Sequence, residues 1–382
     1  HDCKNRYGLF SYGKFFGEKV MSVQVSYKKQ GLFVIMMLVI LFLVVEGVSQ
    51  ILWYDIQNNC KMHERYFADV KDEYAEKLCF DYKHLEYTSE NIRRNLPDQH
   101  LNTLNINSLG FRGSEVDLEK IDNKYRIMMV GGSTTFGLGA TSDNTTIPAL
   151  LEKKINEETD FNVNVINAGI IAASSREEVF YITNDLINFN PDLILVFDGY
   201  NDSFNVKLTE VDDSMTYQGE IEKSDLELFV KKYFKFLAIP NVIYQYTHDY
   251  TQIAYLTEKI QKENSQKWVE RWNKMCQISE EKDFELMITV QPMLGTSDRE
   301  MSNIEEEIFK SSKHQKTVEL LNKLGNSLKE LECDSIDLRE TFNGINQQVF
   351  FSSVHTGDFG NKIIAEKIYE KILPVMIKDI KK

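Results

Sequence analysis

The chain has 382 residues, of which 42% are hydrophobic and 12% aromatic, and its net charge is −14. This content is enough for one sizeable core, so the sequence is not a small scaffold held together by disulfides. The acidic balance argues against nucleic acid as a partner, because that affinity depends on clustered Lys and Arg. We therefore expect one main domain with appendages.

A long apolar run follows the N-terminal segment 1–31. Leu32 begins 14 uninterrupted apolar residues, and the run extends over 32–54. This is long enough to cross the hydrocarbon of a bilayer, which needs about 20 residues. We predict a transmembrane anchor here. The alternatives are a cleaved signal peptide, which normally has a shorter apolar stretch and a small-residue cleavage site, and a buried core helix, which is rarely so uniform.

Charged residues on the two sides of this run bear on its orientation. Lys28 and Lys29 precede it, which favours a cytoplasmic N-terminus and an extracytoplasmic location for the rest of the chain. Lys61, Arg65 and Lys71 follow the run and reduce this bias. We expect a single-pass membrane protein whose larger part lies outside.

Segment 55–105 is polar and charged with scattered aromatic residues, and we interpret it as a stalk or a partly helical lead-in. Four cysteines follow the anchor: Cys60, Cys79, Cys276 and Cys333. They allow two bridges in any of three connectivities, and free buried thiols are the alternative. They form no CxxC or Cys/His ligand spacing, so we expect no structural metal.

Short apolar runs alternate with longer helical periods in the domain at 106–382. The predicted strands are 125–130, 162–168, 192–197, 284–290 and 333–338. The predicted helices are 145–157, 174–189, 256–282, 302–331 and 359–378. Nearly continuous apolar strands are typical of a parallel sheet covered on both faces. The pattern predicts a doubly wound α/β sheet, in which functional residues follow the carboxyl ends of the strands.

The connection between the third and fourth strands has about 85 residues, more than one crossover helix requires. It is rich in aromatic side chains, including Trp268 and Trp272. Aromatic residues at helical spacing are usually part of a core. The sharper hypothesis is a lid over 204–282 whose aromatic side chains cover the substrate.

Candidate catalytic residues follow four of the predicted strands. Ser133 lies in "GGSTTFG", directly after the first strand, and this loop lacks both the phosphate-loop lysine and the GxGxxG spacing. Gly169 ends the second strand, Asn201 lies in "DGYND" after the third, and His355 lies in "SSVHTGDFGN" after the fifth. The N–H groups of Ser133 and Gly169 and the amide of Asn201 are candidate donors to an oxyanion, with His355 as the base for Ser133.

The order and strand-end positions of these four residues resemble the four blocks of the SGNH, or GDSL-like, hydrolase superfamily. "NSLGFRGSE", "PDLILVFDGYND" and "HTGDFGNKIIAEKI" are similar to its membrane-anchored bacterial and archaeal members, and the resemblance covers residues from about 105 to the end. It implies a flavodoxin-like three-layer α/β/α sandwich of about five parallel strands. It also implies Ser133 as nucleophile, His355 as general base and an oxyanion hole of Ser133, Gly169 and Asn201.

Members of this superfamily cleave carboxylic esters, including acetyl groups on carbohydrates, and some transfer acyl groups instead. The resemblance implies no metal and no organic cofactor. We therefore expect an anchored, outward-facing serine esterase whose substrate is an ester, with acylated surface glycans as the candidate. The alternatives are an O-acyltransferase that uses the same residues and a membrane-tethered glycan-binding protein that has lost turnover.

One position departs from the family pattern. The aspartate usually found three residues before the histidine is replaced by Ser352, whose hydroxyl can orient the ring of His355 but carries no charge to stabilise an imidazolium. Asp358 lies at the expected start of the last helix, where we assign it to capping. Asp198 and Asp337 lie at strand ends and are further candidates. The sequence thus predicts a Ser-His dyad oriented by a hydroxyl.

Overall fold

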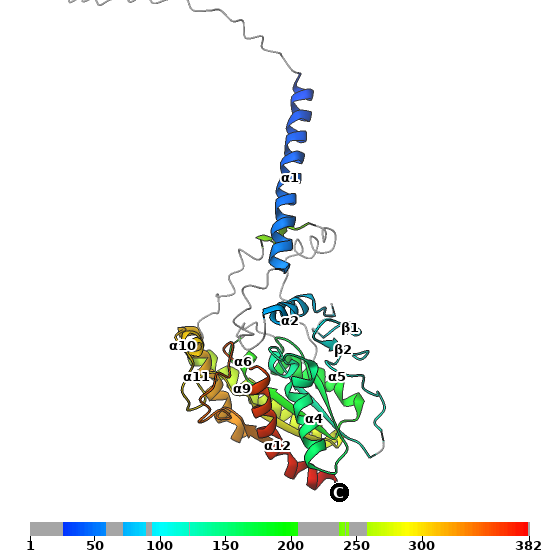
Figure 1. Ribbon diagram of the computed structural model, residues 1–382, viewed down its shortest axis with the longest axis vertical. Helices are drawn as coiled ribbons and strands as arrows, with labels where there is room; N and C mark the ends of the chain where they lie inside the picture. Colours follow the sequence, from blue (N-terminus) through cyan, green and yellow to red (C-terminus); the bar gives the residue numbers. More distant parts are fainter. Residues whose placement is uncertain are drawn as a thin grey trace, which may run out of the picture.

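The computed structural model describes residues 26–58, 72–88, 94–121, 123–204, 237–240, 242–243 and 258–380. Figure 1 shows a layered domain with one long helix, α1 (Tyr27–Asn58), extending away from it. The domain contains the parallel strands β3 (Tyr125–Gly131), β4 (Val163–Gly169), β5 (Leu193–Asp198), β6 (Glu285–Val290) and β7 (Asp334–Asp337).

These strands form one sheet in the order β4-β3-β5-β6-β7, and each neighbouring pair is parallel. Every residue of β3 and β5 is buried, as expected for central strands covered on both faces. The order is that of a flavodoxin-like sheet, in which the chain adds β4 on one side of β3 and then continues on the other. The predicted fold class and all five predicted strands are confirmed.

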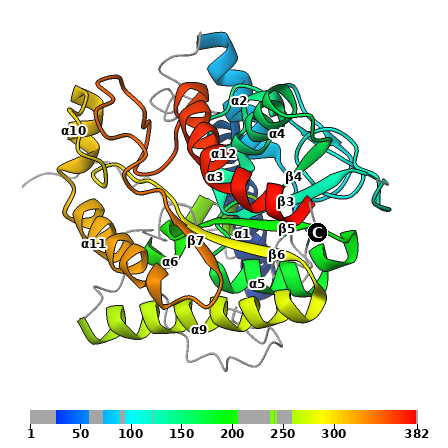
Figure 2. The ribbon, with the colours of Figure 1, turned by 90° about the horizontal axis from the view of Figure 1, so that it is seen from below.

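Helices cover both faces of the sheet (Figure 2). One face packs against α4 (Ile147–Glu158) and α12 (Asp358–Ile380), whose apolar side chains form a single cluster with β3 and β5. The other face packs against α5 (Ser175–Asn184), α9 (Glu258–Lys282) and α11 (Ser312–Ser327). The domain is therefore a three-layer α/β/α sandwich.

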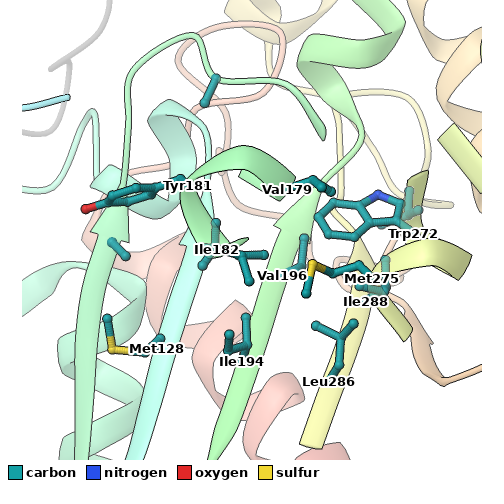
Figure 3. Close-up of a cluster of buried hydrophobic side chains, with 14 of the residues drawn as sticks. Met128, Val179, Tyr181, Ile182, Ile194, Val196, Trp272, Met275, Leu286 and Ile288 are labelled. Carbon is teal, nitrogen blue, oxygen red and sulfur yellow. The ribbon is translucent and has the colours of Figure 1, made fainter. Parts of the chain in front are cut away.

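The last third of the predicted lid 204–282 is α9, which is a core helix. Figure 3 shows Trp272 and Met275 packed against side chains of the sheet, and Trp268 and Trp272 are both 0% exposed. Two tryptophans one turn apart on a helix put their rings on the same face, which here is the face toward the sheet. Most of the remainder of the predicted lid lies outside the described residues.

The predicted helix 302–331 is interrupted. The structure has α10 (Asn303–Phe309), α11, and a 3-10 turn over Leu328–Glu330. Ser311 has an extended backbone, with φ −67° and ψ 124°, and forms the N-cap of α11. Serine is among the residues preferred at an N-cap, and the non-helical backbone of Ser311 separates α11 from α10. The other short elements are 3-10 turns at Asp143–Thr145 and Leu186–Phe189.

The lead-in before the sheet packs onto the domain. It contains α2 (Asp72–His84) and a small antiparallel pair, β1 (Gln99–His100) with β2 (Asn105–Ile106). A cluster of buried side chains joins it to the loop after β3: Leu85, Leu104, Ile106 and Phe136. This part of segment 55–105 is therefore not a free stalk.

Helix α1 is long and apolar enough to cross a membrane, and its apolar window is 0% buried. This agrees with the expected anchor, and a signal sequence at the N-terminus would have the same properties. Of the predicted N-terminal segment 1–31, residues 1–25 lie outside the described residues.

A disulfide joins Cys276 of α9 to Cys333, the residue before β7, across 57 residues of chain. Cys79 of α2 is also disulfide-bonded, and Cys60 lies outside the described residues. Of the alternatives left open by the sequence, bridges rather than free thiols are therefore present. The Cys276–Cys333 bond ties the longest sheet-covering helix to the edge of the sheet.

Replacing both Cys276 and Cys333 by alanine is expected to destabilise the protein by about 4 kcal/mol, because the bond closes a long loop in the unfolded chain. Denaturant unfolding of the double variant beside the wild type measures this difference. Unchanged stability would show that the bond does not constrain the unfolded chain. The site described below should keep its geometry, because neither cysteine contacts it.

Candidate active site

The candidate catalytic residues leave the sheet at one edge. Gly131, the last residue of β3, is in register with Gly169 of β4 and Phe197 of β5. Ser133 begins the short helix α3 (Ser133–Phe136) immediately after β3, and Asn201 lies in α6 (Tyr200–Phe204) after β5. These loops emerge side by side at the carboxyl ends of the strands, where ligands bind in open α/β sheets.

Ser133 and His355 are in direct contact although 222 residues separate them. The Ser133 Oγ lies 2.7 Å from the His355 Nε2. On the other side of the ring, the His355 Nδ1 lies 2.7 Å from the Ser352 Oγ. The structure thus joins Ser133, His355 and Ser352 in one hydrogen-bonded line.

The Ser352 hydroxyl can accept from the ring of His355 or donate to it, because its hydrogen is free to rotate. Its Oγ also accepts the backbone N–H of His355 at 3.1 Å, so this oxygen already acts as an acceptor in the turn. With Nδ1–H donating to Ser352, Nε2 has a free lone pair for the hydroxyl proton of Ser133. The loop itself is fixed by a bond from the Leu294 N–H to the Ser353 carbonyl at 3.0 Å.

His355 is held in its neutral form. Desolvation by the surrounding protein lowers the pKa of His355 from 6.5 to about 4, because the site disfavours the charged ring and provides no opposite charge. Neutral imidazole is the form that accepts a proton, so the base is ready over a wide pH range. The same burial makes it costly in free energy to form the imidazolium when His355 accepts a proton.

The carboxylates considered from the sequence are engaged elsewhere. Asp358 accepts the N–H and the hydroxyl of Thr141, at 2.9 and 2.5 Å. Asp337 pairs with Arg339 at 2.6 Å. Asp198 accepts the indole N–H of Trp268 at 2.8 Å. Among the described hydrogen bonds, the ring of His355 has two serine partners and no carboxylate.

Two candidate oxyanion donors lie next to the Ser133 hydroxyl. The Ser133 N–H is at the first position of α3, where a helix provides no internal partner. The Asn201 Nδ2 donates to the Ala173 carbonyl at 2.5 Å, which leaves its second hydrogen available. A Cβ added at Gly132 would overlap this Nδ2. Glycine is therefore required at 132 for the amide to lie against the nucleophile loop.

Gly169, the third predicted donor, has a visible packing role. Its N–H donates to the Asn167 Oδ1 at 3.1 Å, and a Cβ on it would overlap the backbone N of Phe136. It thus allows α3 to lie directly on β4, while its own N–H is already bonded. The turn that follows brings forward Ala172, which is exposed and has a φ of +68°.

The conformation of Ala172 is unusual, since residues other than glycine rarely adopt positive φ outside strained or functional turns. No partner for its N–H is present among the described residues. Sequence reasoning missed this residue because alanine carries no chemical signal. Ala172 directly precedes Ala173, whose carbonyl accepts from the Asn201 amide, so it is an additional candidate donor.

Arg112 is a second residue whose role the sequence did not indicate. Its side chain is 0% exposed and pairs with Asp143, the distance from Nε to Oδ1 being 2.8 Å. Its Nη1 donates to the Gly137 carbonyl at 2.9 Å and the Phe136 carbonyl at 3.2 Å. A buried guanidinium thus satisfies the C-terminal carbonyls of α3, which is favourable at a helix C-terminus. It fixes the short helix that carries Ser133.

Three carboxyl groups lie near Asn201, and those of Glu178 and Asp198 are buried, whereas Asp202 is partly exposed. Burial raises the pKa of Glu178 and of Asp198 well above their usual values, and the charge of Asp202 adds to the effect on both. Asp202 accepts the N–H and hydroxyl of Ser175, at 2.8 and 2.5 Å. The group links β5, α5 and α6 behind the proposed donor. No group of His, Cys, Asp or Glu in the described part of the chain is arranged to hold a metal ion.

No protein-family model and no curated protein matches the sequence. Solved structures match the chain at low identity. An acetyl xylan esterase is 15% identical over 65% of this chain and 99% of its own, with a TM-score of 0.39. A variant of an acetyl-xylooligosaccharide esterase from Geobacillus Stearmophilus is 12% identical over 65% and 94%, with a TM-score of 0.40. A putative acylhydrolase from Bacteroides fragilis is 14% identical over 67% and 90%, with a TM-score of 0.38.

Replacing Ser352 by aspartate is expected to raise the pKa of His355, because a negative charge at hydrogen-bond distance favours the imidazolium. Modification of Ser133 by a fluorophosphonate requires neutral His355, so its rate falls as pH falls through that pKa. Wild type should lose half its rate near pH 4, and Ser352→Asp at a pH higher by about one unit or more. Ser353→Asp, with the same charge one residue away, is the control and should move the midpoint less.

Replacing Gly132 by alanine is expected to displace the amide of Asn201 without unfolding the protein, since the overlapping atom is the end of a side chain. Losing one oxyanion donor costs about 10²- to 10³-fold in rate, which the burst of nitrophenol from nitrophenyl acetate measures. The double variant Gly132→Ala, Asn201→Ala should be no slower than Asn201→Ala alone. Additive losses would contradict an effect through Asn201.

Proposed function

We propose that the protein is a serine esterase that hydrolyses carboxylic esters, with Ser133 as nucleophile and His355 as general base. The observation that carries this proposal is the 2.7 Å contact between the Ser133 Oγ and the His355 Nε2. A nucleophile within hydrogen-bond distance of a base, with the base oriented by a third group, is the arrangement that covalent catalysis requires.

The reaction follows from this geometry. The Ser133 Oγ attacks the carbonyl carbon of the ester while its proton moves to the Nε2 of His355. The carbonyl oxygen becomes an oxyanion, which accepts from the Ser133 N–H, the second amide hydrogen of Asn201 and a donor of the Gly169–Ala172 turn. As the ester bond breaks, Nε2 returns the proton to the leaving alcohol. Water then attacks the acyl-Ser133 with the same proton transfers, releasing the acid.

Ser352 is a positioning residue in this mechanism. When its hydroxyl accepts from Nδ1–H, the lone pair stays on Nε2, which is the part of the aspartate's role that concerns the tautomer. Ser352 supplies no charge to the imidazolium that forms during attack. We therefore expect a slower enzyme than one with a carboxylate at this position, and an increase in rate for Ser352→Asp.

The finer proposal is that the substrate is an O-acetyl ester on a surface glycan, reached by a domain that α1 anchors on the extracytoplasmic side. An O-acyltransferase would use the same residues with a sugar hydroxyl in place of water. A glycan-binding protein without turnover would keep the fold but would not need Ser133 and His355 in hydrogen-bond contact. The contact between Ser133 and His355 favours the two catalytic functions.

Full-length protein in detergent is expected to react covalently with a fluorophosphonate at Ser133, and Ser133→Ala should lose this labelling. Ser353→Ala is the matched control, as it removes a nearby serine that is not in contact with the histidine ring. Hydrolysis of nitrophenyl acetate should fall by about 10³-fold or more in Ser133→Ala. A folded wild type that neither labels nor turns over would reject the esterase in favour of a binding protein.

Adding sugar acceptors to the same assay separates the two enzymes. A hydrolase releases acetate at a rate that the acceptor does not change. A transferase gives acetylated sugar at the expense of acetate while nitrophenol release continues. Mass spectrometry of the sugar measures this division directly.

A further inference from the structure

Helix α1 carries a carboxylate in its apolar part. Glu46 lies eight residues before Tyr54, which corresponds to about 12 Å along a helix, so it lies within the run 32–54 that is long enough to cross a bilayer. A charged side chain at such a depth costs about 3 kcal/mol unless it has partners. An acidic residue inside a span is therefore expected to have specific hydrogen-bond partners.

The partners of Glu46 come from a segment almost 200 residues away. Its carboxylate accepts the backbone N–H of Ala238 at 2.6 Å and that of Ile239 at 3.3 Å. Within α1, the side chain of Gln50 donates to the same carboxylate at 2.6 Å. These bonds satisfy both the carboxylate and two backbone donors, which cannot be left unpaired in an apolar medium.

Burial confirms that the segment covers one face of α1. Ala238 is 1% exposed, and Ser49 is 7% exposed although the residues on either side of it are exposed. Ser49 and Glu46 are three residues apart and so lie on the same helix face. The segment Leu237–Pro240 with Val242 and Ile243, called here the α1-contact segment, appears in green beside α1 in Figure 1.

The α1-contact segment also connects to the candidate active site. It lies in the connection between α6, which carries Asn201, and α9. Figure 1 places the C-terminus at the end of the domain farthest from α1. Helix α12 begins three residues after His355 and runs to that end, so the edge of the sheet that carries His355 faces α1.

We propose that the α1-contact segment is a second membrane element, held against α1 by Glu46 and inserted beside it in the lipid. Its described side chains are apolar, with Asn241 between Pro240 and Val242 in the sequence. Ile243 is 54% exposed, and the apolar side chains of α1 are exposed as well. Irregular backbone enters a bilayer only where protein satisfies it. The membrane lipid is therefore the partner of this surface, and α1 is a permanent part of the protein.

This placement gives the substrate class, in a step that rests on the proposed esterase function. A catalytic edge that faces α1, with the connection from Asn201 returning to the membrane, opens toward the bilayer. The ester is thus carried by a membrane amphiphile, such as an acylated saccharide on a lipid, and not by a freely dissolved molecule.

Photo-cross-linking in phosphatidylcholine vesicles tests the membrane contact. A benzophenone amino acid at Ile243 of the full-length protein is expected to cross-link to radiolabelled phosphatidylcholine. The same group at Leu118 is the control, because this side chain is 58% exposed but lies before β3, at the opposite edge of the sheet from Ser133. Equal lipid labelling at the two positions would overturn the proposal.

Substitutions in α1 test the role of Glu46. Glu46→Leu removes the acceptor for Ala238 and is expected to reduce lipid cross-linking from position 243 by about fivefold, as for loss of about 1 kcal/mol. Gln50→Leu, the same change one turn along, leaves those bonds and should reduce it much less. If Glu46→Leu cross-links like wild type, the segment is not held by Glu46. Equal losses of cross-linking in Glu46→Leu and Gln50→Leu would also show that the segment is not held by Glu46.

Kinetics separate the substrate proposal from the esterase proposal. For Glu46→Leu, turnover of nitrophenyl palmitate in phosphatidylcholine vesicles should fall by about tenfold, and that of dissolved nitrophenyl acetate should change by less than about twofold. Equal losses on both substrates, or none on the palmitate, would overturn the membrane-borne substrate. If the wild type cleaves neither ester, the esterase function fails, while cross-linking still decides the membrane contact.

Discussion

Three strands end at one level, and the candidate site depends on that register. Gly131 lies opposite both Gly169 and Phe197, so the loops after β3, β4 and β5 begin at the same height. The spacing is close enough that a side chain at Gly131 would overlap Thr135 and the Phe197 carbonyl. A one-residue slip of any of these strands would separate the hydroxyl from its donors and reverse the faces of the strand. The register of the sheet therefore determines where the loops of the candidate site begin.

Burial around the candidate site favours the neutral forms of three of its titratable groups. The pKa of His355 is lowered to about 4, and the pKa values of Asp198 and Glu178 are raised; each shift favours the neutral form because burial penalises charge. In the proposed reaction, an oxyanion and an imidazolium appear together, close enough to stabilise each other in a medium of low dielectric constant. A fixed carboxylate is less necessary in such a site than in one open to water.

The strands were predictable because burial on both faces leaves a nearly continuous apolar signal, as in Leu193–Asp198. The order of Ser133, Asn201 and His355 after strand ends was also visible, because topology alone brings strand ends together. The directions in which side chains point could not be predicted from the sequence. The bond between the Gly169 N–H and Asn167, the burial of Arg112 and the positive φ of Ala172 depend on three-dimensional contacts. Aromatic spacing could not separate lid from core, because both uses put rings on one helix face.

The disulfide between Cys276 and Cys333 bears on where the chain matures. Such bonds form and persist in oxidising compartments and are rare in the cytosol. The two cysteines are 57 residues apart, one on α9 and one beside the edge strand β7, so the bond closes only after the last strand has been synthesised and has reached its place. In the proposed outward orientation, the domain therefore completes its fold only after export.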